Sequence, residues 1–94
     1  MMIMVTFDWA PDSKAIAEGI ARFQRTGGQP PAGVKLLGRW TRTDFGGGFA
    51  LLETDDPKAL TEFALSWSDI MSLTTAPVVD DQSLSEVLAR GGRP

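Results

Sequence analysis

The sequence contains no cysteine, no histidine and no tyrosine among its 94 residues. Without cysteine the chain forms no disulfide and offers no thiolate nucleophile. Without histidine it lacks the commonest general base and the commonest nitrogen ligand for metal ions, so a zinc site would consist of carboxylates alone. These absences predict a protein without a bound metal ion, and nothing in the sequence indicates a cofactor.

Basic residues are also scarce, and the formal net charge is −3. Nucleic acids call for a basic face and anionic membranes for a polybasic cluster, so neither partner is expected. No apolar run approaches the length of a membrane span. The apolar start, Met1 to Val5, lacks the basic region and the cleavage site of a signal peptide, so we expect a cytoplasmic protein.

What the sequence does contain is typical of one small soluble domain. Apolar residues make up 43% and charged residues 22% of the chain. We expect the folded domain to cover residues 1–81, followed by a short helix and a frayed tail over residues 82–94. A domain this small buries a modest share of its surface, so association with a second copy would add useful burial.

Apolar periodicity predicts four strands and two main helices. Ile3, Val5 and Phe7 alternate along the first strand, whereas Ile16, Ile20 and their neighbours recur at helical spacing. Strands are expected over residues 2–9, 34–43, 49–54 and 71–79, and helices from Lys14 to about Thr26 and from Pro57 to about Asp69.

Local signals fix the ends of several of these elements. Gly46–Gly48 predicts a tight turn, so the strands on either side of it should pair antiparallel. Asp56 before Pro57 is typical of a helix start. Pro77 cannot donate to a ladder, which places the last strand at an edge or a bulge. Ser83 and Glu86 fit a capping box for the terminal helix.

The element order is therefore β-α-β-β-α-β, an α+β arrangement. It places both helices on one face of a four-stranded antiparallel sheet. Leu51 and Leu52 are adjacent, so they make both faces of their strand apolar. The face without helices needs a cover, and a second subunit is the simplest one.

Several short motifs, in this order, resemble a small bacterial family known only as a domain of unknown function. They are the opening apolar strand, Pro30–Gly33, Gly38–Trp40, Gly47–Glu53, Trp67–Asp69 and Pro77–Val79. That family is similar in turn to the dimeric α/β-barrel superfamily of ferredoxin-like folds. The resemblance implies a homodimer whose two sheets face each other, with ligand pockets between sheet and helices or inside the barrel. It carries over no catalytic residue. The haem-binding branches of the superfamily use a histidine, and this chain has none.

Arg39 and Trp40 are the first candidates for a ligand site. Arg39 can hold a carboxylate or phenolate while Trp40 stacks on the ligand. The structural alternative is an Arg39 paired with Glu53 beside a core tryptophan. Trp67 lies on the apolar stripe of the second helix, where it can line the same pocket or simply fill the core.

Glu53 and Asp69 complete the candidate set. Glu53 acts as a base if buried with a raised pKa, or forms a cross-strand ion pair with Lys35; the hairpin register decides between these. Asp69 follows a helix C-terminus, where a negative charge is unfavourable unless something binds it. The aspartate pairs at 55–56 and 80–81 are expected to cap helices and not to bind metal.

These observations favour a homodimer that binds a small molecule. A dimerisation module without catalysis is the alternative, and a cofactor-free monooxygenase is a further one that no residue selects. RNA-recognition domains share the element order, but Gly48–Glu53 lacks the basic residue and the closing aromatic of their third-strand motif. The sequence names no ligand and leaves open whether the protein is an enzyme.

Overall fold

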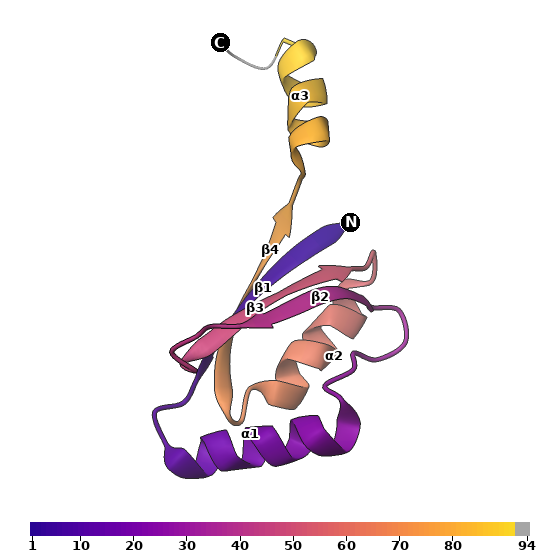
Figure 1. Ribbon diagram of the computed structural model, residues 1–94. Helices are drawn as coiled ribbons and strands as arrows, with labels where there is room; N and C mark the ends of the chain where they lie inside the picture. Colours follow the sequence, from indigo (N-terminus) through magenta and orange to yellow (C-terminus); the bar gives the residue numbers. More distant parts are fainter. Residues whose placement is uncertain (92–94) are drawn as a thin grey trace.

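The computed structural model describes residues 1–91. Within them, four strands and three helices follow one another, and no helix there is long and apolar enough to cross a membrane. In chain order the elements are β1 (Met2–Trp9), α1 (Ser13–Thr26), β2 (Lys35–Thr41), β3 (Gly47–Glu53), α2 (Pro57–Trp67), β4 (Met71–Val78) and α3 (Asp81–Ala89) (Figure 1).

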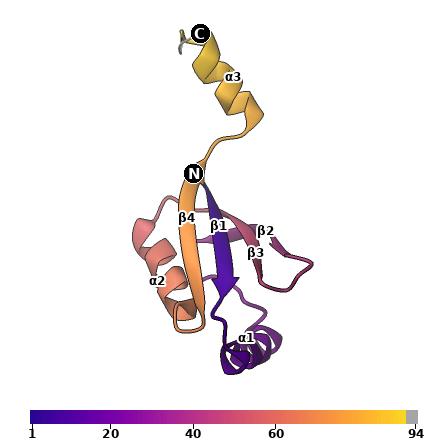
Figure 2. The same ribbon diagram turned by 90° about the vertical axis from the view of Figure 1, so that its left-hand side faces the viewer.

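The strands form one antiparallel sheet in the order β2-β3-β1-β4. The α+β arrangement expected from the sequence is confirmed: β3 and β1 are the two central strands, and α1 and α2 lie on the same side of the sheet (Figure 2). β4 pairs only with β1, so Pro77 lies on an edge strand, where a residue without an N–H is tolerated.

The core lies between the sheet and α2. Ile3, Val5 and Leu52 project from the two central strands and meet Ala59 and Phe63 of α2. Leu52 is fully buried, and the burial of such a side chain contributes about 1.5–3 kcal/mol. This packing fixes α2 firmly on the sheet.

Helix α1 is held differently, because it buries only Gly19. The apolar side chains of Ile20 and Phe23 remain 38% and 49% exposed. The indole of Trp9 reaches α1 at Gly19, where an added Cβ would lie 2.1 Å from the ring. Absence of a side chain at Gly19 therefore lets β1 and α1 approach at one end, while the rest of α1 stands off the sheet.

Aspartates cap all three helices of the described chain. Asp12 accepts a hydrogen bond from the Lys14 N–H, and Asp56 accepts from the N–H groups at the start of α2, as the sequence predicts. At α3 the expected capping box is wrong: Asp80, not Ser83, is the N-cap, and it accepts from the Ser83 N–H. This hydrogen bond lowers the pKa of Asp80.

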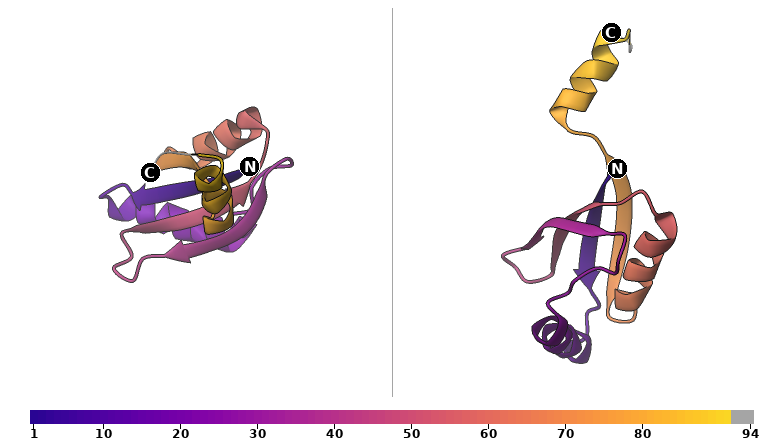
Figure 3. Two further views of the ribbon diagram at one scale, coloured as in Figure 1. Left: turned by 90° about the horizontal axis from the view of Figure 1, so that it is seen from above. Right: turned by 90° about the vertical axis from the view of Figure 1, so that its right-hand side faces the viewer.

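Helix α3 projects away from the sheet, at the opposite end of the molecule from α1 (Figure 3). It has no buried residue, and its apolar side chains Leu84, Val87 and Leu88 are all exposed. Val79 and Asp80 alone join it to β4. The terminal helix therefore adds nothing to the core of the domain.

Candidate functional site

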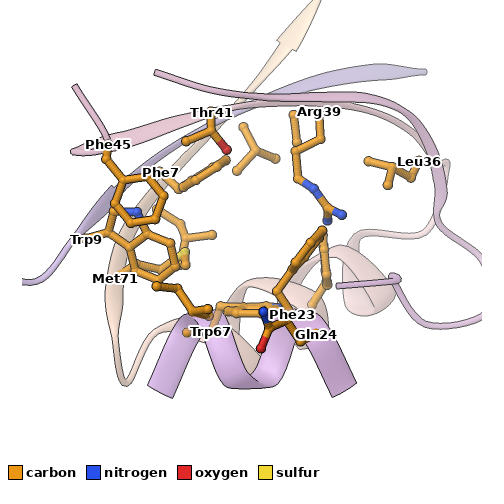
Figure 4. Close-up of a pocket in the computed structure, with 16 residues that line it drawn as sticks. Phe7, Trp9, Phe23, Gln24, Leu36, Arg39, Thr41, Phe45, Trp67 and Met71 are labelled. Carbon is orange, nitrogen blue, oxygen red and sulfur yellow. The ribbon is translucent and has the colours of Figure 1, made fainter. Parts of the chain in front are cut away.

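A cavity of about 770 Å³ separates α1 from the sheet. Sixteen residues line it (Figure 4), and they come from every strand and from both helices on this side. Most are apolar or aromatic. Three carry polar side-chain groups other than an indole, namely Gln24, Arg39 and Thr41. Arg39 is the one charged residue among the sixteen.

A β-bulge positions Arg39. Leu36 pairs with Leu52 and Gly38 pairs with Leu51, which leaves Leu37 as an extra residue on β2. The alternation of side chains shifts by one at this point. Arg39 therefore pairs with the buried Ala50 and projects from the helix-facing side of the sheet into the cavity.

The guanidinium of Arg39 is held by backbone and by an aromatic ring. Nη1 donates to the Gly28 carbonyl at 2.8 Å, and Nη2 donates to the Gly27 carbonyl at 2.9 Å. The group lies 5.0 Å from the centre of the Phe23 ring. Partial burial lowers the pKa of Arg39. No carboxylate among residues 1–91 forms an ion pair with it.

Aromatic residues crowd the other end of the cavity (Figure 4). Trp9 stacks on Phe45 with ring centres 6.2 Å apart and meets Phe7 edge-on at 6.5 Å. Phe45 holds this place with a left-handed backbone, at φ 60°. The buried Nε1–H of Trp9 has no hydrogen-bond partner within the described residues. Buried donors without partners are uncommon and call for an explanation.

The expected grouping of Arg39, Trp40 and Trp67 needs one correction. Arg39 and Trp67 both line the cavity, but Trp40 does not. Trp40 pairs with Phe49 and lies on the opposite face of the sheet, over Gly38, where an added Cβ would come 2.7 Å from its ring. Neighbours in a strand point to opposite faces, so one ligand cannot contact both Arg39 and Trp40 on the same side.

Glu53 also lies away from the cavity. It pairs in register with Lys35, and both side chains are exposed on the face without helices. The alternative in which Arg39 pairs with Glu53 is therefore wrong. Glu53 and Lys35 face each other across the ladder, as one of the two expected registers requires.

Asp69 has the partner that its position calls for. Arg22 of α1 donates two hydrogen bonds to its carboxylate, at 2.9 and 3.1 Å, and a third to the Ser66 carbonyl at 2.9 Å. These hydrogen bonds lower the pKa of Asp69 and raise that of Arg22. The Arg22 guanidinium also lies 5.2 Å from the centre of the Trp67 ring. Asp69 thus ties α1 to the end of α2 at the cavity margin.

Sequence reasoning overlooked the aromatic residues that line the cavity other than Trp67, which are Phe7, Trp9, Phe23, Phe45 and Phe63. The position of Trp9 could have been predicted, because Trp9 continues the alternation of Ile3, Val5 and Phe7 on one face of β1. Phe45 was not, since a residue in a hairpin loop carries no periodic signal. Its place depends on the turn, which runs over residues 42–46 and leaves Gly47 and Gly48 inside β3.

The face of the sheet without helices is a second candidate surface. Trp40 and Phe49 lie side by side on it and are 56% and 41% exposed. Leu51 lies two residues beyond Phe49 on β3 and pairs with Met4 of β1, and both of these side chains are half-buried. We call these four residues the open sheet face. Adjacent exposed aromatics of this kind mark interaction surfaces more often than isolated ones do.

The fold and the cavity define a small α+β protein of the ferredoxin-like type, with space between its sheet and its first helix. Residues 1–92 match the family described as "Domain of unknown function (DUF3303)", and the chain belongs to that family. No curated protein matches the chain. Among solved structures it is similar to Rv0793 from Mycobacterium tuberculosis, with 14% identity and a TM-score of 0.55 over 86% of this chain and 98% of that one. At this identity the likeness shows the fold alone.

Proposed function

We propose that this protein binds an apolar small molecule in the cavity between α1 and the sheet. The cavity itself carries the proposal: its volume of about 770 Å³ lies in the range of about 300–1,000 Å³ that is usual for ligand pockets. Its lining is aromatic and aliphatic with a few polar groups, which is the composition such pockets share. Of the residues expected to bind the ligand, Arg39 and Trp67 belong to this site.

Two features of the lining support a bound molecule. Ile20 and Phe23 lie on the inner face of α1 yet keep much of their surface exposed. An apolar ligand would remove that surface from water. A ligand with a hydrogen-bond acceptor near Trp9 would also satisfy its unpartnered Nε1–H.

A fluorescence titration with N-phenyl-1-naphthylamine, a neutral probe that brightens in apolar surroundings, tests this function. We expect saturable binding, and we expect Ile20→Trp to weaken it at least about tenfold by filling the cavity. Ala21→Trp is the matched control, because Ala21 is the next residue of α1 and does not line the cavity. Equal affinity in the two variants would exclude the cavity as the binding site.

We also propose that two copies pair through the open sheet face. Trp40 and Phe49 are the supporting observation, since they leave an apolar surface uncovered on the face that carries no helix. This is compatible with ligand binding, because the cavity lies on the other side of the sheet. If the protein proves to bind no small molecule, this surface supports the second candidate function, a dimerisation module without catalysis.

A further inference from the structure

We propose that the ligand of this cavity is an organic anion, a flat apolar body with one acidic group that ion-pairs with Arg39. This inference rests on the proposed function and names the chemical class of the ligand. It depends on one fact about the lining: among the sixteen described residues that form it, the guanidinium of Arg39 is the only charged group. Aromatic side chains surround the remaining space, so the ligand body is apolar and the charged end is specified by Arg39.

Arg39 has a structural role and still keeps N–H donors with which it can bind a ligand. Its two hydrogen bonds to the Gly27 and Gly28 carbonyls tie β2 to the end of α1. A guanidinium carries more N–H donors than these two bonds employ. Carbonyl oxygens are neutral acceptors, so they orient the cation without cancelling its charge. The arginine is thus positioned in advance, as a binding site for an acidic group requires.

The surroundings of Arg39 strengthen its attraction for an anion. It is partly buried beside the Phe23 ring, and charges interact more strongly in such a setting than in bulk water. Several acidic side chains already have cationic partners outside the cavity. Asp69 pairs with Arg22, and Asp8 and Asp44 pair with Arg42. Glu53 faces Lys35 across the ladder. Acids on the protein therefore do not compete for Arg39 within the described chain.

The far end of the cavity favours a ring over a flexible chain. Phe7, Trp9 and Phe45 form a contiguous aromatic cluster there, and Trp67 lies against the same space from α2. Aromatic side chains stack on flat rings with defined geometry. The preferred ligand accordingly combines an aromatic body with a carboxylate, sulfonate or phenolate group.

Two fluorescent probes with the same ring system separate charge from shape. One is 1-anilinonaphthalene-8-sulfonate, which is anionic; the other is the neutral N-phenyl-1-naphthylamine. We expect the wild-type protein at low salt to bind the anion about tenfold more tightly than the neutral probe, because a charge-assisted pair forms only with the anion. Arg39→Met should reduce this ratio to about one. Its affinity for the neutral probe should stay close to that of the wild type.

Lys35→Met is the matched control, since it removes the same charge from the same strand but on the opposite face of the sheet. It should leave the ratio unchanged. Arg39→Lys keeps the charge and loses the bridge to two carbonyls, so it should retain a several-fold preference for the anion. Near-ultraviolet circular dichroism verifies that each variant is folded. If Arg39→Met fails to fold, the wild-type ratio, its decline with added salt and the Arg39→Lys variant still decide the matter.

The outcomes distinguish this inference from the function on which it rests. A wild-type ratio near one, or a ratio that Arg39→Met leaves intact or that Lys35→Met abolishes, overturns the anion proposal while the pocket stands. Failure of both probes to bind overturns the proposed function, and this inference with it. A tight, Arg39-dependent preference for the anion supports both.

Discussion

Arg39 lies opposite Ala50 in the β2–β3 ladder, although Lys35 lies opposite Glu53 in the same ladder. The pairing register shifts by one residue between these two pairs, because Leu37 is an extra residue in β2. As a result, the two cations of β2 lie on opposite faces of the sheet. Lys35 shares the open side with Glu53, and Arg39 enters an apolar cavity without a carboxylate partner in the described chain. One bulge thus separates a surface charge from a candidate binding group.

The Arg22–Asp69 pair should make the protein sensitive to acid. The folded-state pKa of Asp69 is lowered, so the pair stabilises the fold fully above the unfolded pKa of about 3.9, and this contribution is lost as the pH falls through the folded value. Asp69→Asn should lower the melting temperature at pH 7. The difference from the wild type should shrink below about pH 4 and vanish once the wild-type carboxyl is protonated.

Glu62→Gln provides the control for that measurement. It removes a charge of the same sign from the exposed surface of α2, and Glu62 forms no ion pair within residues 1–91. Thermal melts across this pH range should therefore show little effect of Glu62→Gln. If both variants respond to pH in the same way, the Arg22–Asp69 pair does not hold α1 to α2.

Contact between Trp9 and Gly19 should make glycine essential in the middle of α1. An added Cβ would lie 2.1 Å from the indole, so Gly19→Ala forces either the ring or the helix to move. Overpacking of this kind costs about 1–3 kcal/mol. The better helix propensity of alanine returns only about 0.5–1 kcal/mol, so the variant should be less stable.

Urea denaturation gives the free energy of unfolding for this comparison. Ala17→Gly, on the exposed side of α1, measures the propensity difference alone and should destabilise by about 1 kcal/mol. Should Gly19→Ala turn out as stable as the wild type or more so, Trp9 does not pack against α1 as described.

The structural features that depend on neighbouring residues could be predicted from the sequence. The hairpin of β2 and β3, the cap at Asp56 and the edge position of Pro77 follow from local chemistry, and the structure has all three. The bulge at Leu37 was not predictable, since no residue there distinguishes a bulged strand from a regular one. The bulge decides that Arg39 faces the helices. The expectation that one site unites Arg39 and Trp40 failed for another reason, because adjacent residues of a strand point to opposite faces of the sheet.

Contacts between residues far apart in the chain could not be predicted from the sequence either. Asp69 was recognised as an acid that needed a partner, but Arg22 lies 47 positions earlier in the chain. The apolar stripe of α1 was read correctly as one face of a helix. Nothing in its spacing indicated that Ile20 and Phe23 face an open cavity and not a packed sheet. Helix propensity and periodicity describe which residues share a face, and tertiary packing decides how closely that face is covered.

Thr54 should be important for the start of α2. Its hydroxyl donates to the Gly33 carbonyl at 2.7 Å and accepts from the Asp56 N–H at 3.0 Å, and its side chain is buried. Thr54→Val keeps the shape but leaves both backbone groups without this partner, which should cost about 1–3 kcal/mol in unfolding free energy. Thr74→Val, at an exposed position of β4, should have little effect in the same urea titration. Matching midpoints for the two variants would contradict the assigned role.

The open sheet face should control the oligomeric state. If two copies pair through Trp40 and Phe49, Trp40→Asp places a charge at the centre of the interface and should convert a dimer at micromolar concentration into a monomer. Leu65→Asp is the matched control, because Leu65 is more exposed than Trp40 but lies on α2, away from this face. Size-exclusion chromatography with light scattering distinguishes the two species directly. A wild-type protein that is already monomeric would exclude the dimer proposal. A Trp40→Asp variant that stays dimeric would show that the interface lies on another surface. The exposed apolar side chains of α3 would then be the next to substitute.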